Sequence, residues 1–231
     1  MKAYVLAAGL GTRLRPLTNQ MPKCLVPIKG KPLLEIWLEL LEKHGVTEVL
    51  INLHYKAEMV HVFLQQYNGP IRVHCVYEEQ LLGSAGTIRE NQAFVQAGEP
   101  FFIINADNLT NINLTRMMEA YLANPSILFM ALFQSADPQS CGIAVLGERQ
   151  MITGFVEKPV QPKSNLANAG IYIADERLFS YLTKDTPADL GTDVFPQLIG
   201  IMKGYMLSEY LLDIGTMEAY LKAQEEWPYD Y

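Results

Sequence analysis

The chain has 231 residues, of which 49% are hydrophobic and 19% are charged, a composition typical of a folded globular domain. Its formal net charge of −7 argues against nucleic acid or an anionic membrane as a partner, and no apolar run is long enough to cross a bilayer. Cys24, Cys75 and Cys141 are an odd number without metal-ligand spacing, so we expect free thiols and a reducing, cytoplasmic location.

Short apolar runs alternate with segments of helical periodicity through the first half of the chain. In chain order, the patterns predict a strand at 3–8, a helix at 32–45, a strand at 47–53, a helix at 57–67, a strand at 71–77, a helix at 84–98, a strand at 100–107, a helix at 113–124 and a strand at 126–133. This alternation predicts the α/β class, with a Rossmann-like mixed, mostly parallel sheet covered by helices on both faces.

The pattern changes after about residue 135. We expect a hairpin with strands at 143–146 and 151–157, a strand at 168–174, helices near 175–182 and 190–203, and a strand end near 211–213 that leads into a final helix. No linker or low-complexity tract divides the chain, so residues 1–231 are expected to form a single domain with a small second β/α lobe from about residue 136.

Glycines and cations are concentrated directly after the first predicted strand, in the segment LAAGLGTRLRPLTNQMPKCLVPIKGKPLLE. Gly9 and Gly11 would let backbone N–H groups approach phosphate oxygens closely, and Arg13 supplies a fixed positive charge. A Walker loop would need lysine and a hydroxyl residue after its last glycine, and a dinucleotide fingerprint would need a glycine where Leu14 stands. The glycines alone leave a plain tight turn as an alternative.

The whole segment resembles the amino-terminal motif of the sugar-1-phosphate nucleotidyltransferases, also called NDP-sugar pyrophosphorylases: GxGTRLxPLT, then PKxLxPIxGKPxLE. The resemblance extends along essentially the whole chain. It implies a nucleotide-binding part at about 1–135 and a sugar-binding part at about 136–231. In this family the loop matching Gly9–Arg13 wraps the phosphates, and the lysine matching Lys23 reaches the reacting phosphates. A solvated surface lysine is the alternative for Lys23.

The stretch YEEQLLGSAGTI, at 77–88, resembles the turn that holds the nucleobase in this family, in the form found in guanylyltransferases. Small residues at 83–86 would let a flat base lie against the backbone. Glu78 could accept two hydrogens from the edge of guanine. Ser84 could instead be only a helix N-cap. The resemblance implies these nucleotide-binding residues: Leu6, Ala8, Gly9, Gly11, Thr12, Arg13, Glu78, Gly83, Ser84 and Gly86.

Asp107 ends a predicted buried strand, where an isolated carboxylate is costly without a cation. Magnesium bound by one or two carboxylates and phosphate oxygens is a natural partner. Asp213 in LLDIGT matches the family's late metal-binding aspartate, whereas Ala106 replaces the usual glycine. The resemblance therefore implies Mg²⁺ on Asp107 and Asp213, and catalytic roles for Arg13, Lys23 and Asp107. Strand-end caps are the alternative for both aspartates.

The motifs FVEKP, at 155–159, and NAGIY, at 168–172, resemble the sugar-side motifs of the family. Glu157 and Asn168 would bind sugar hydroxyls, Lys158 would hold the sugar phosphate, and Gly142 would let the sugar approach the backbone. A surface ion pair between Glu157 and Lys158 is the alternative. The implied sugar-phosphate-binding residues are Asn105, Gly142, Glu157, Lys158, Asn168 and Gly170.

The implied reaction needs no protein nucleophile. A phosphate oxygen of the sugar 1-phosphate attacks the α-phosphorus of a nucleoside triphosphate, so catalysis is mainly charge neutralisation and alignment. The chain most resembles the short D-glycero-D-manno-heptose 1-phosphate guanylyltransferases. Guanylyl transfer to mannose 1-phosphate, uridylyl transfer to another sugar 1-phosphate, and a non-catalytic sugar-nucleotide sensor are the alternatives. The oligomeric state stays open, a homo-oligomer included.

Overall fold

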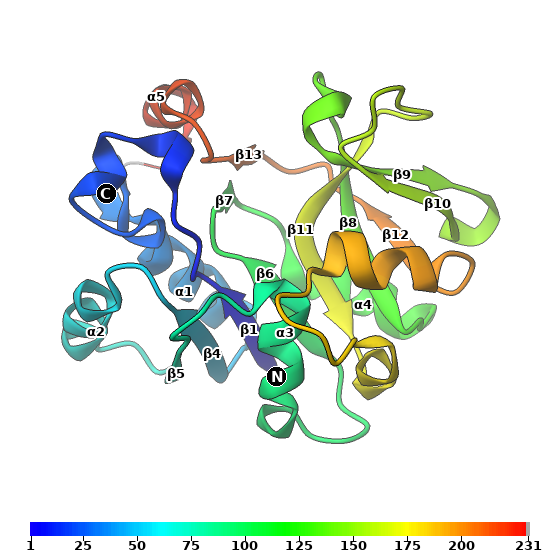
Figure 1. Cartoon of the computed structure of the whole chain (residues 1–231), viewed down its shortest axis with the longest axis horizontal. Coiled ribbons are helices and arrows are strands. Elements are labelled where there is room, and N and C mark those ends of the chain that lie inside the picture. The colour runs from blue at the N-terminus through cyan, green and yellow to red at the C-terminus, as the bar shows by residue number, and fades with distance from the viewer. Residues whose placement is uncertain (230–231) are drawn as a thin grey trace.

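The computed structural model describes residues 1–229, and its centre is a nine-stranded mixed sheet (Figure 1). The strands are β1 (Lys2–Leu6), β4 (Glu48–Leu53), β5 (Arg72–Tyr77), β6 (Phe101–Asn105), β8 (Leu128–Gln134), β9 (Gly142–Leu146), β10 (Ile152–Glu157), β11 (Leu166–Ala174) and β12 (Lys203–Met206). The order is β10-β9-β11-β6-β1-β4-β5, with β8 beside β11 and β12 beside β8. Strands β5, β4, β1 and β6 form a parallel core, and β11 runs antiparallel to β6. The predicted fold class is confirmed.

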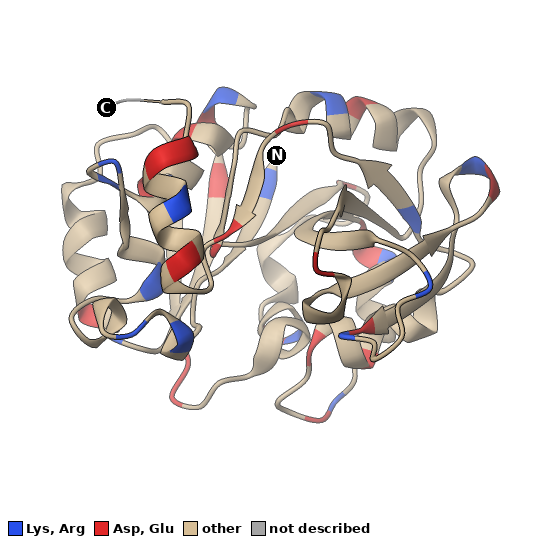
Figure 2. Cartoon of the chain, turned by 90° about the horizontal axis from the view of Figure 1, so that it is seen from above, with Lys and Arg blue, Asp and Glu red and all other residues tan. Residues whose placement is uncertain are grey.

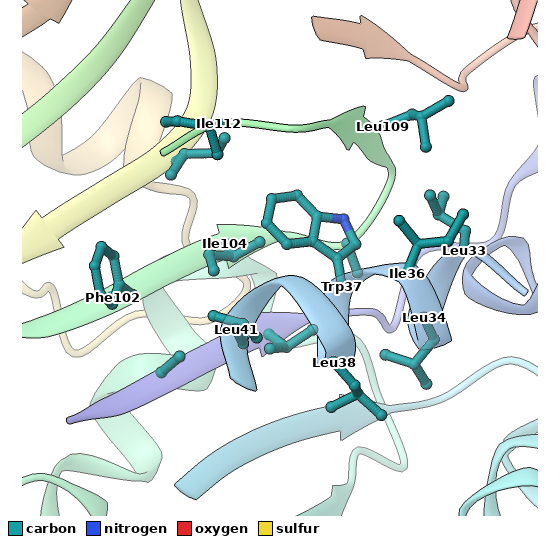
Figure 3. Packing of buried hydrophobic residues seen from close by; sticks show 14 of the residues in the cluster. Leu33, Leu34, Ile36, Trp37, Leu38, Leu41, Phe102, Ile104, Leu109 and Ile112 are labelled. Carbon is teal, nitrogen blue, oxygen red and sulfur yellow. The ribbon is translucent and has the colours of Figure 1, made fainter. Parts of the chain in front are cut away.

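Both faces of the sheet are buried, which explains the continuous apolar runs in the sequence. In β1, Ala3 and Val5 belong to one hydrophobic cluster, and Tyr4 between them belongs to another. The first cluster is covered by α1 (Leu33–Lys43), α2 (Ala57–Gln66), α4 (Leu114–Ala123) and α5 (Met217–Glu226); the second is covered by α3 (Gly83–Glu90) and short helical turns. Figure 3 shows Trp37 of α1 beside Ile104 of the sheet.

The predicted helix at 190–203 is wrong in its second half. The structure has a π-helical turn at Leu190–Val194, a 3₁₀ turn at Phe195–Leu198, and then strand β12, which runs parallel to β8. Pro196 has no N–H to donate to a helix, and Gly200 takes a φ of +86°, which turns the chain out of the helical path. The predicted helix at 84–98 is also shorter: α3 ends at Glu90, and a 3₁₀ turn follows at Gln92–Phe94.

A small antiparallel pair of strands was only half predicted. Strand β13 (Leu211–Asp213) begins where a strand end was expected, but its partner β7 (Asn108–Thr110) was not predicted. After β13 the chain returns to its N-terminal half, where α5 lies beside a short hairpin of β2 (Pro27–Ile28) and β3 (Lys31–Pro32) (Figure 1). Oε1 of Gln224 accepts a hydrogen bond from the Lys29 N–H, and its Nε2 donates one to the Pro27 carbonyl oxygen, both at 2.8 Å. The division of the chain near residue 135 stays a prediction.

Charged residues belong mainly to the outer helices and loops, and the central strands contain few of them (Figure 2). Cys24, Cys75 and Cys141 are free thiols, as predicted. Within residues 1–229, every helix is too short or too polar to span a bilayer. The polar residues that matter for chemistry are therefore sought at the ends of the strands, where parallel α/β sheets bind ligands.

Candidate active site

Two adjoining cavities lie at the carboxyl ends of the parallel strands. The first has a volume of about 530 Å³ and is lined by Leu6, Ala7, Ala8, Gly9, Lys23, Cys24, Asn52, Glu78, Leu81, Gly83, Ser84, Asn105, Ala106, Asp107, Pro187 and Asp189. The second has a volume of about 360 Å³ and is lined by Ser84, Asn105, Glu157, Lys158, Asn168, Tyr172, Asp189, Leu190, Gly191 and Thr192. Three residues are shared, so the cavities form one continuous site with room for two ligands.

The structure brings most of the predicted residues to these two cavities. Six of the predicted nucleotide-binding residues line the first cavity: Leu6, Ala8, Gly9, Glu78, Gly83 and Ser84. Asn105 lines both cavities, and Glu157, Lys158 and Asn168 line the second. The predicted residues that line neither are Gly11, Thr12, Arg13, Gly86, Gly142, Gly170 and Asp213.

The two glycines of the loop, Gly9 and Gly11, differ in backbone conformation and in the space around them. Gly11 has a φ of +61°, and a Cβ there would lie 2.9 Å from Cγ2 of Thr18, so the local geometry requires glycine. The Thr18 hydroxyl also donates to the Gly11 carbonyl oxygen at 2.8 Å and holds the loop in place. At Gly9, a Cβ would meet no described atom within 4 Å. The open space at Gly9 faces the first cavity, which leaves its backbone accessible to a ligand.

Lys23 joins the two predicted metal-binding aspartates. Its Nζ lies 2.8 Å from Oδ2 of Asp107 and 3.4 Å from Oδ1 of Asp213. Nη2 of Arg13 lies 4.0 Å from the other oxygen of Asp213. The alternative of a solvated Lys23 is wrong, because the residue is only 8% exposed. The pairing of β7 with β13, together with an N–H of Ile214 that donates to the Asp107 carbonyl oxygen at 2.9 Å, brings the aspartates together.

The charges of this cluster influence one another. Burial of the Asp213 carboxyl raises its pKa, and the negative charge of Asp107 raises it further, while Lys23 and Arg13 oppose the shift. More than half of the Asp213 side chain is still exposed, so solvent moderates these effects. Two carboxylates and two cations give a nearly neutral cluster at the edge of the first cavity.

The donor set fits a magnesium ion. Two carboxylate oxygens already converge on a single ammonium group, and the same oxygens could converge on a divalent cation. Within residues 1–229, no group of three or more histidine, cysteine, aspartate and glutamate side chains is arranged to hold a metal. A cation here would therefore complete its shell with phosphate oxygens and water, as Mg²⁺ commonly does.

Glu78 is held by the protein on both of its carboxylate oxygens. Oε1 accepts hydrogen bonds from Oγ1 of Thr87 at 2.5 Å and from Nδ2 of Asn52 at 2.8 Å, and Oε2 accepts from the N–H of Leu82 at 3.1 Å. Sequence reasoning missed Asn52 and Thr87. A signal for Asn52 existed: it is a polar residue within the apolar run of β4, next to the strand end where ligands bind.

The first turn of α3 is capped by a segment from far along the chain. The carbonyl oxygen of Ala188 accepts from the N–H groups of Ala85 at 2.9 Å and Gly86 at 3.2 Å. Both N–H and Oγ of Ser84 donate to Oδ1 of Asp189, at 3.2 and 3.0 Å. The N-cap alternative for Ser84 is wrong, because the N-cap position is occupied by Leu82.

The acidic residue of the second cavity sits against a glycine. A Cβ at Gly142 would lie 2.5 Å from Oε2 of Glu157 and 2.7 Å from Cζ of Phe155, so glycine makes room for the carboxylate. Burial raises the pKa of Glu157, Lys158 opposes the shift, and Asp189 adds to it. The alternative of an ion pair between Lys158 and Glu157 is present, at 4.0 Å, but it is weak, because the Lys158 side chain is 64% exposed.

Asn168 and Gly170 shape a bulge in β11 beside Asn105. Nδ2 of Asn168 donates to the Tyr172 hydroxyl at 2.8 Å, and Oδ1 accepts from the Gly170 N–H at 2.9 Å. Gly170 has a φ of +67°, and a Cβ there would lie 2.8 Å from Nδ2 of Asn105. Sequence reasoning missed Tyr172, which is buried and lines the second cavity; burial raises the pKa of its hydroxyl.

A mixed α/β sheet with a glycine loop and two joined cavities at the carboxyl ends of its parallel strands is typical of nucleotide-binding α/β proteins. The family model described as Nucleotidyl transferase matches residues 2–228, and the chain belongs to this family. The resemblance noted in the sequence is confirmed at this level.

Two relatives illustrate the range of similarity. D-glycero-alpha-D-manno-heptose 1-phosphate guanylyltransferase of Aneurinibacillus thermoaerophilus is 30% identical over 230 residues, and 98% of each chain is covered. Mannose-1-phosphate guanylyltransferase 1 of Arabidopsis thaliana is 31% identical over 228 residues. The match covers 96% of this chain and 63% of the plant protein, so the chain spans less than two thirds of that relative's length.

Solved structures share the fold. HddC from Yersinia pseudotuberculosis, in a complex with GMP-PN, is 28% identical with a TM-score of 0.83, and 98% of this chain and 99% of that chain are covered. UDP-glucose pyrophosphorylase complexed with UDP-glucose has a TM-score of 0.87 and 24% identity, with coverage of 98% and 97%. The second similarity concerns the fold alone.

Proposed function

We propose that the protein transfers a nucleoside monophosphate from a nucleoside triphosphate to a sugar 1-phosphate, with release of pyrophosphate. The preferred substrates are GTP and a heptose 1-phosphate, and Mg²⁺ is the cofactor. The observation that carries the proposal is the convergence of Lys23, Asp107 and Asp213 at the edge of the first cavity, next to the residues it shares with the second. Phosphates of two substrates could meet there.

The nucleotide would occupy the larger cavity, with its base near 78–86 and its phosphates near the glycine loop. The sugar 1-phosphate would occupy the smaller cavity, with its hydroxyls toward Glu157 and its phosphate near Lys158. In this arrangement an anionic phosphate oxygen faces the α-phosphorus, so the main obstacle is repulsion between anions. Catalysis then requires positive charge and alignment rather than a protein nucleophile.

Lys23 would neutralise part of this charge. Its buried ammonium now balances two carboxylates, and it lines the cavity proposed for the triphosphate. Arg13 is 66% exposed at the mouth of the glycine loop and could close over the outer phosphates. When bound, Mg²⁺ would be held by Asp107 and Asp213 and would supply further positive charge to the phosphates.

The choice of guanine and heptose rests on the relatives. The Aneurinibacillus enzyme is matched over almost its full length and is named for guanylyl transfer to a heptose 1-phosphate. The Yersinia structure is described as a complex with GMP-PN. Glu78, at the wall of the larger cavity, offers a carboxylate to hydrogen-bond donors of a purine base.

The test is a panel of four nucleoside triphosphates crossed with the 1-phosphates of D-glycero-D-manno-heptose, mannose, glucose and N-acetylglucosamine, scored by pyrophosphate release with and without Mg²⁺. We expect the highest turnover with GTP, the heptose phosphate and Mg²⁺. The Asp107→Asn and Lys23→Ala variants should lose at least about 100-fold in turnover while remaining folded by circular dichroism. Sugar-nucleotide binding without any turnover would instead indicate a sensor.

A further inference from the structure

We propose, on the basis of the function proposed above, that Asn52 is a positioning residue that sets nucleobase selectivity. It does so by fixing the Glu78 carboxylate and tying it to the start of the glycine loop. Asn52 lies near the carboxyl end of β4, directly opposite Leu6 of β1 in the strand register. It is 5% exposed and lines the larger cavity.

The side chain of Asn52 connects three parts of the site through one amide. Its Oδ1 accepts a hydrogen bond from the N–H of Ala7, at 2.8 Å, where β1 gives way to the glycine loop. Its Nδ2 donates to Oε1 of Glu78 at 2.8 Å and to Oγ1 of Thr87, on α3, at 3.0 Å. Only a group with both an acceptor and two donors can make these three bonds.

These bonds decide what Glu78 can offer to a ligand. The Thr87 hydroxyl also lies 3.0 Å from the Gly83 carbonyl oxygen, but its single proton favours Oε1 of Glu78 at 2.5 Å. Oε1 therefore receives two donors and Oε2 receives one, from Leu82. Among residues 1–229, these contacts use both acceptor positions of Oε1 and one of Oε2, and they hold the carboxylate in one orientation. Because Glu78 lines the larger cavity, the second acceptor position of Oε2 is the one that a ligand there could use.

A carboxylate fixed in this way selects bases that present an N–H donor. Guanine presents a ring N–H and an amino group on one edge, whereas adenine has an unprotonated ring nitrogen at the corresponding position. An adenine there would place two acceptors against each other and leave the second acceptor position of Oε2 of Glu78 without a hydrogen bond. The discrimination depends on the orientation of Glu78, and the orientation depends on Asn52 and Thr87.

The key variant is Asn52→Asp. It has nearly the same shape and keeps an acceptor for the Ala7 N–H, but it replaces the donors to Glu78 and Thr87 with a carboxylate. Thr87→Val removes the second donor to Glu78 at similar volume, and Thr87→Ser keeps the hydroxyl as its matched control. If Asn52→Asp does not fold, the threonine pair still tests the proposal.

The first readout is steady-state kinetics with GTP and ATP. We expect Asn52→Asp to raise the KM for GTP by about tenfold or more and Thr87→Val by about fivefold, with kcat within about threefold of wild type. Both variants should lower the selectivity, measured as kcat/KM for GTP divided by kcat/KM for ATP. Thr87→Ser should keep the selectivity of wild type. An unchanged ratio, or a fall in kcat without a change in the KM for GTP, would overturn the proposal.

The second readout is calorimetric binding of GTP and ATP, which needs no turnover. If wild type binds GTP selectively but catalyses no transfer, the proposed function fails, and a loss of selectivity in Asn52→Asp still supports the role of Asn52. If wild type catalyses transfer and Asn52→Asp binds both nucleotides with wild-type selectivity, the role of Asn52 alone fails. If wild type shows no preference between the two, there is no selectivity for Asn52 to set, and the proposal is wrong.

Discussion

Gly83 is a position where adding one methyl group should be strongly destabilising, because its φ is positive and the atoms in the way belong to the backbone. Its φ is +76°, and a Cβ there would lie 2.3 Å from the carbonyl oxygen and 2.7 Å from the carbonyl carbon of Ala188. The left-handed conformation costs an L-residue about 1–2 kcal/mol, and overpacking costs about 1–3 kcal/mol. Gly83→Ala should therefore lower the free energy of unfolding by about 2–5 kcal/mol.

The damage should also reach the nucleotide site. The atoms in the way belong to the backbone of Ala188, which caps the N–H groups of Ala85 and Gly86, so the segment must move to admit the methyl group. For a protein of this size, we expect a fall in Tm of roughly 4–20 °C and weaker binding of GTP. Urea unfolding and calorimetry measure the two effects.

Gly9→Ala is the matched control. Its Cβ would meet no described atom within 4 Å, so the free energy of unfolding should stay within about 0.5 kcal/mol of wild type. Because Gly9 lines the larger cavity, this variant should instead lose activity by hindering the approach of phosphate. A Gly83→Ala protein with the Tm of wild type would refute the reasoning about the Ala188 contact.

Three further predictions concern the charged residues and the sugar side. Gly142→Ala should raise the KM for the sugar 1-phosphate at least about fivefold, because its Cβ would lie 2.5 Å from Oε2 of Glu157. The KM for GTP should stay within about twofold of wild type. Equal changes in both constants would contradict this prediction. Because the pKa of Glu157 is raised in the folded protein, the protonated carboxyl is favoured by folding. The stability that this group contributes is therefore fully present below about pH 4.5 and is lost as the pH rises. Glu157→Gln should therefore have a higher Tm than wild type at pH 7 and an equal one near pH 4, and a lower Tm at pH 7 would count against it. Lys23→Met should bind Mn²⁺ more tightly than wild type, because the ammonium no longer neutralises the two carboxylates. Paramagnetic resonance titrations without nucleotide measure this affinity. Weaker binding by the variant would show that the lysine does not compete with the metal.

The order and burial of the main elements follow from the sequence. The apolar runs of β1, β4 and β6 bury side chains on both faces of the sheet, and their length and spacing predicted the α/β class. The segments from Gly9 to Lys23 and from Tyr77 to Ile88 identified the family, because their motifs are local and long.

Contacts between distant segments were decided only by the tertiary structure. Asp107 and Asp213 meet because β7 pairs with β13, and the cap of α3 comes from Ala188 and Asp189, which lie between the two helices predicted near 175–182 and 190–203. The sequence analysis missed Asn52, because the role of its amide depends on contacts with three elements that lie far apart in the chain. The physical reason is that periodicity records which face of an element is buried, a local property. Which distant backbone or side-chain groups satisfy one another depends on how the whole chain closes around the core.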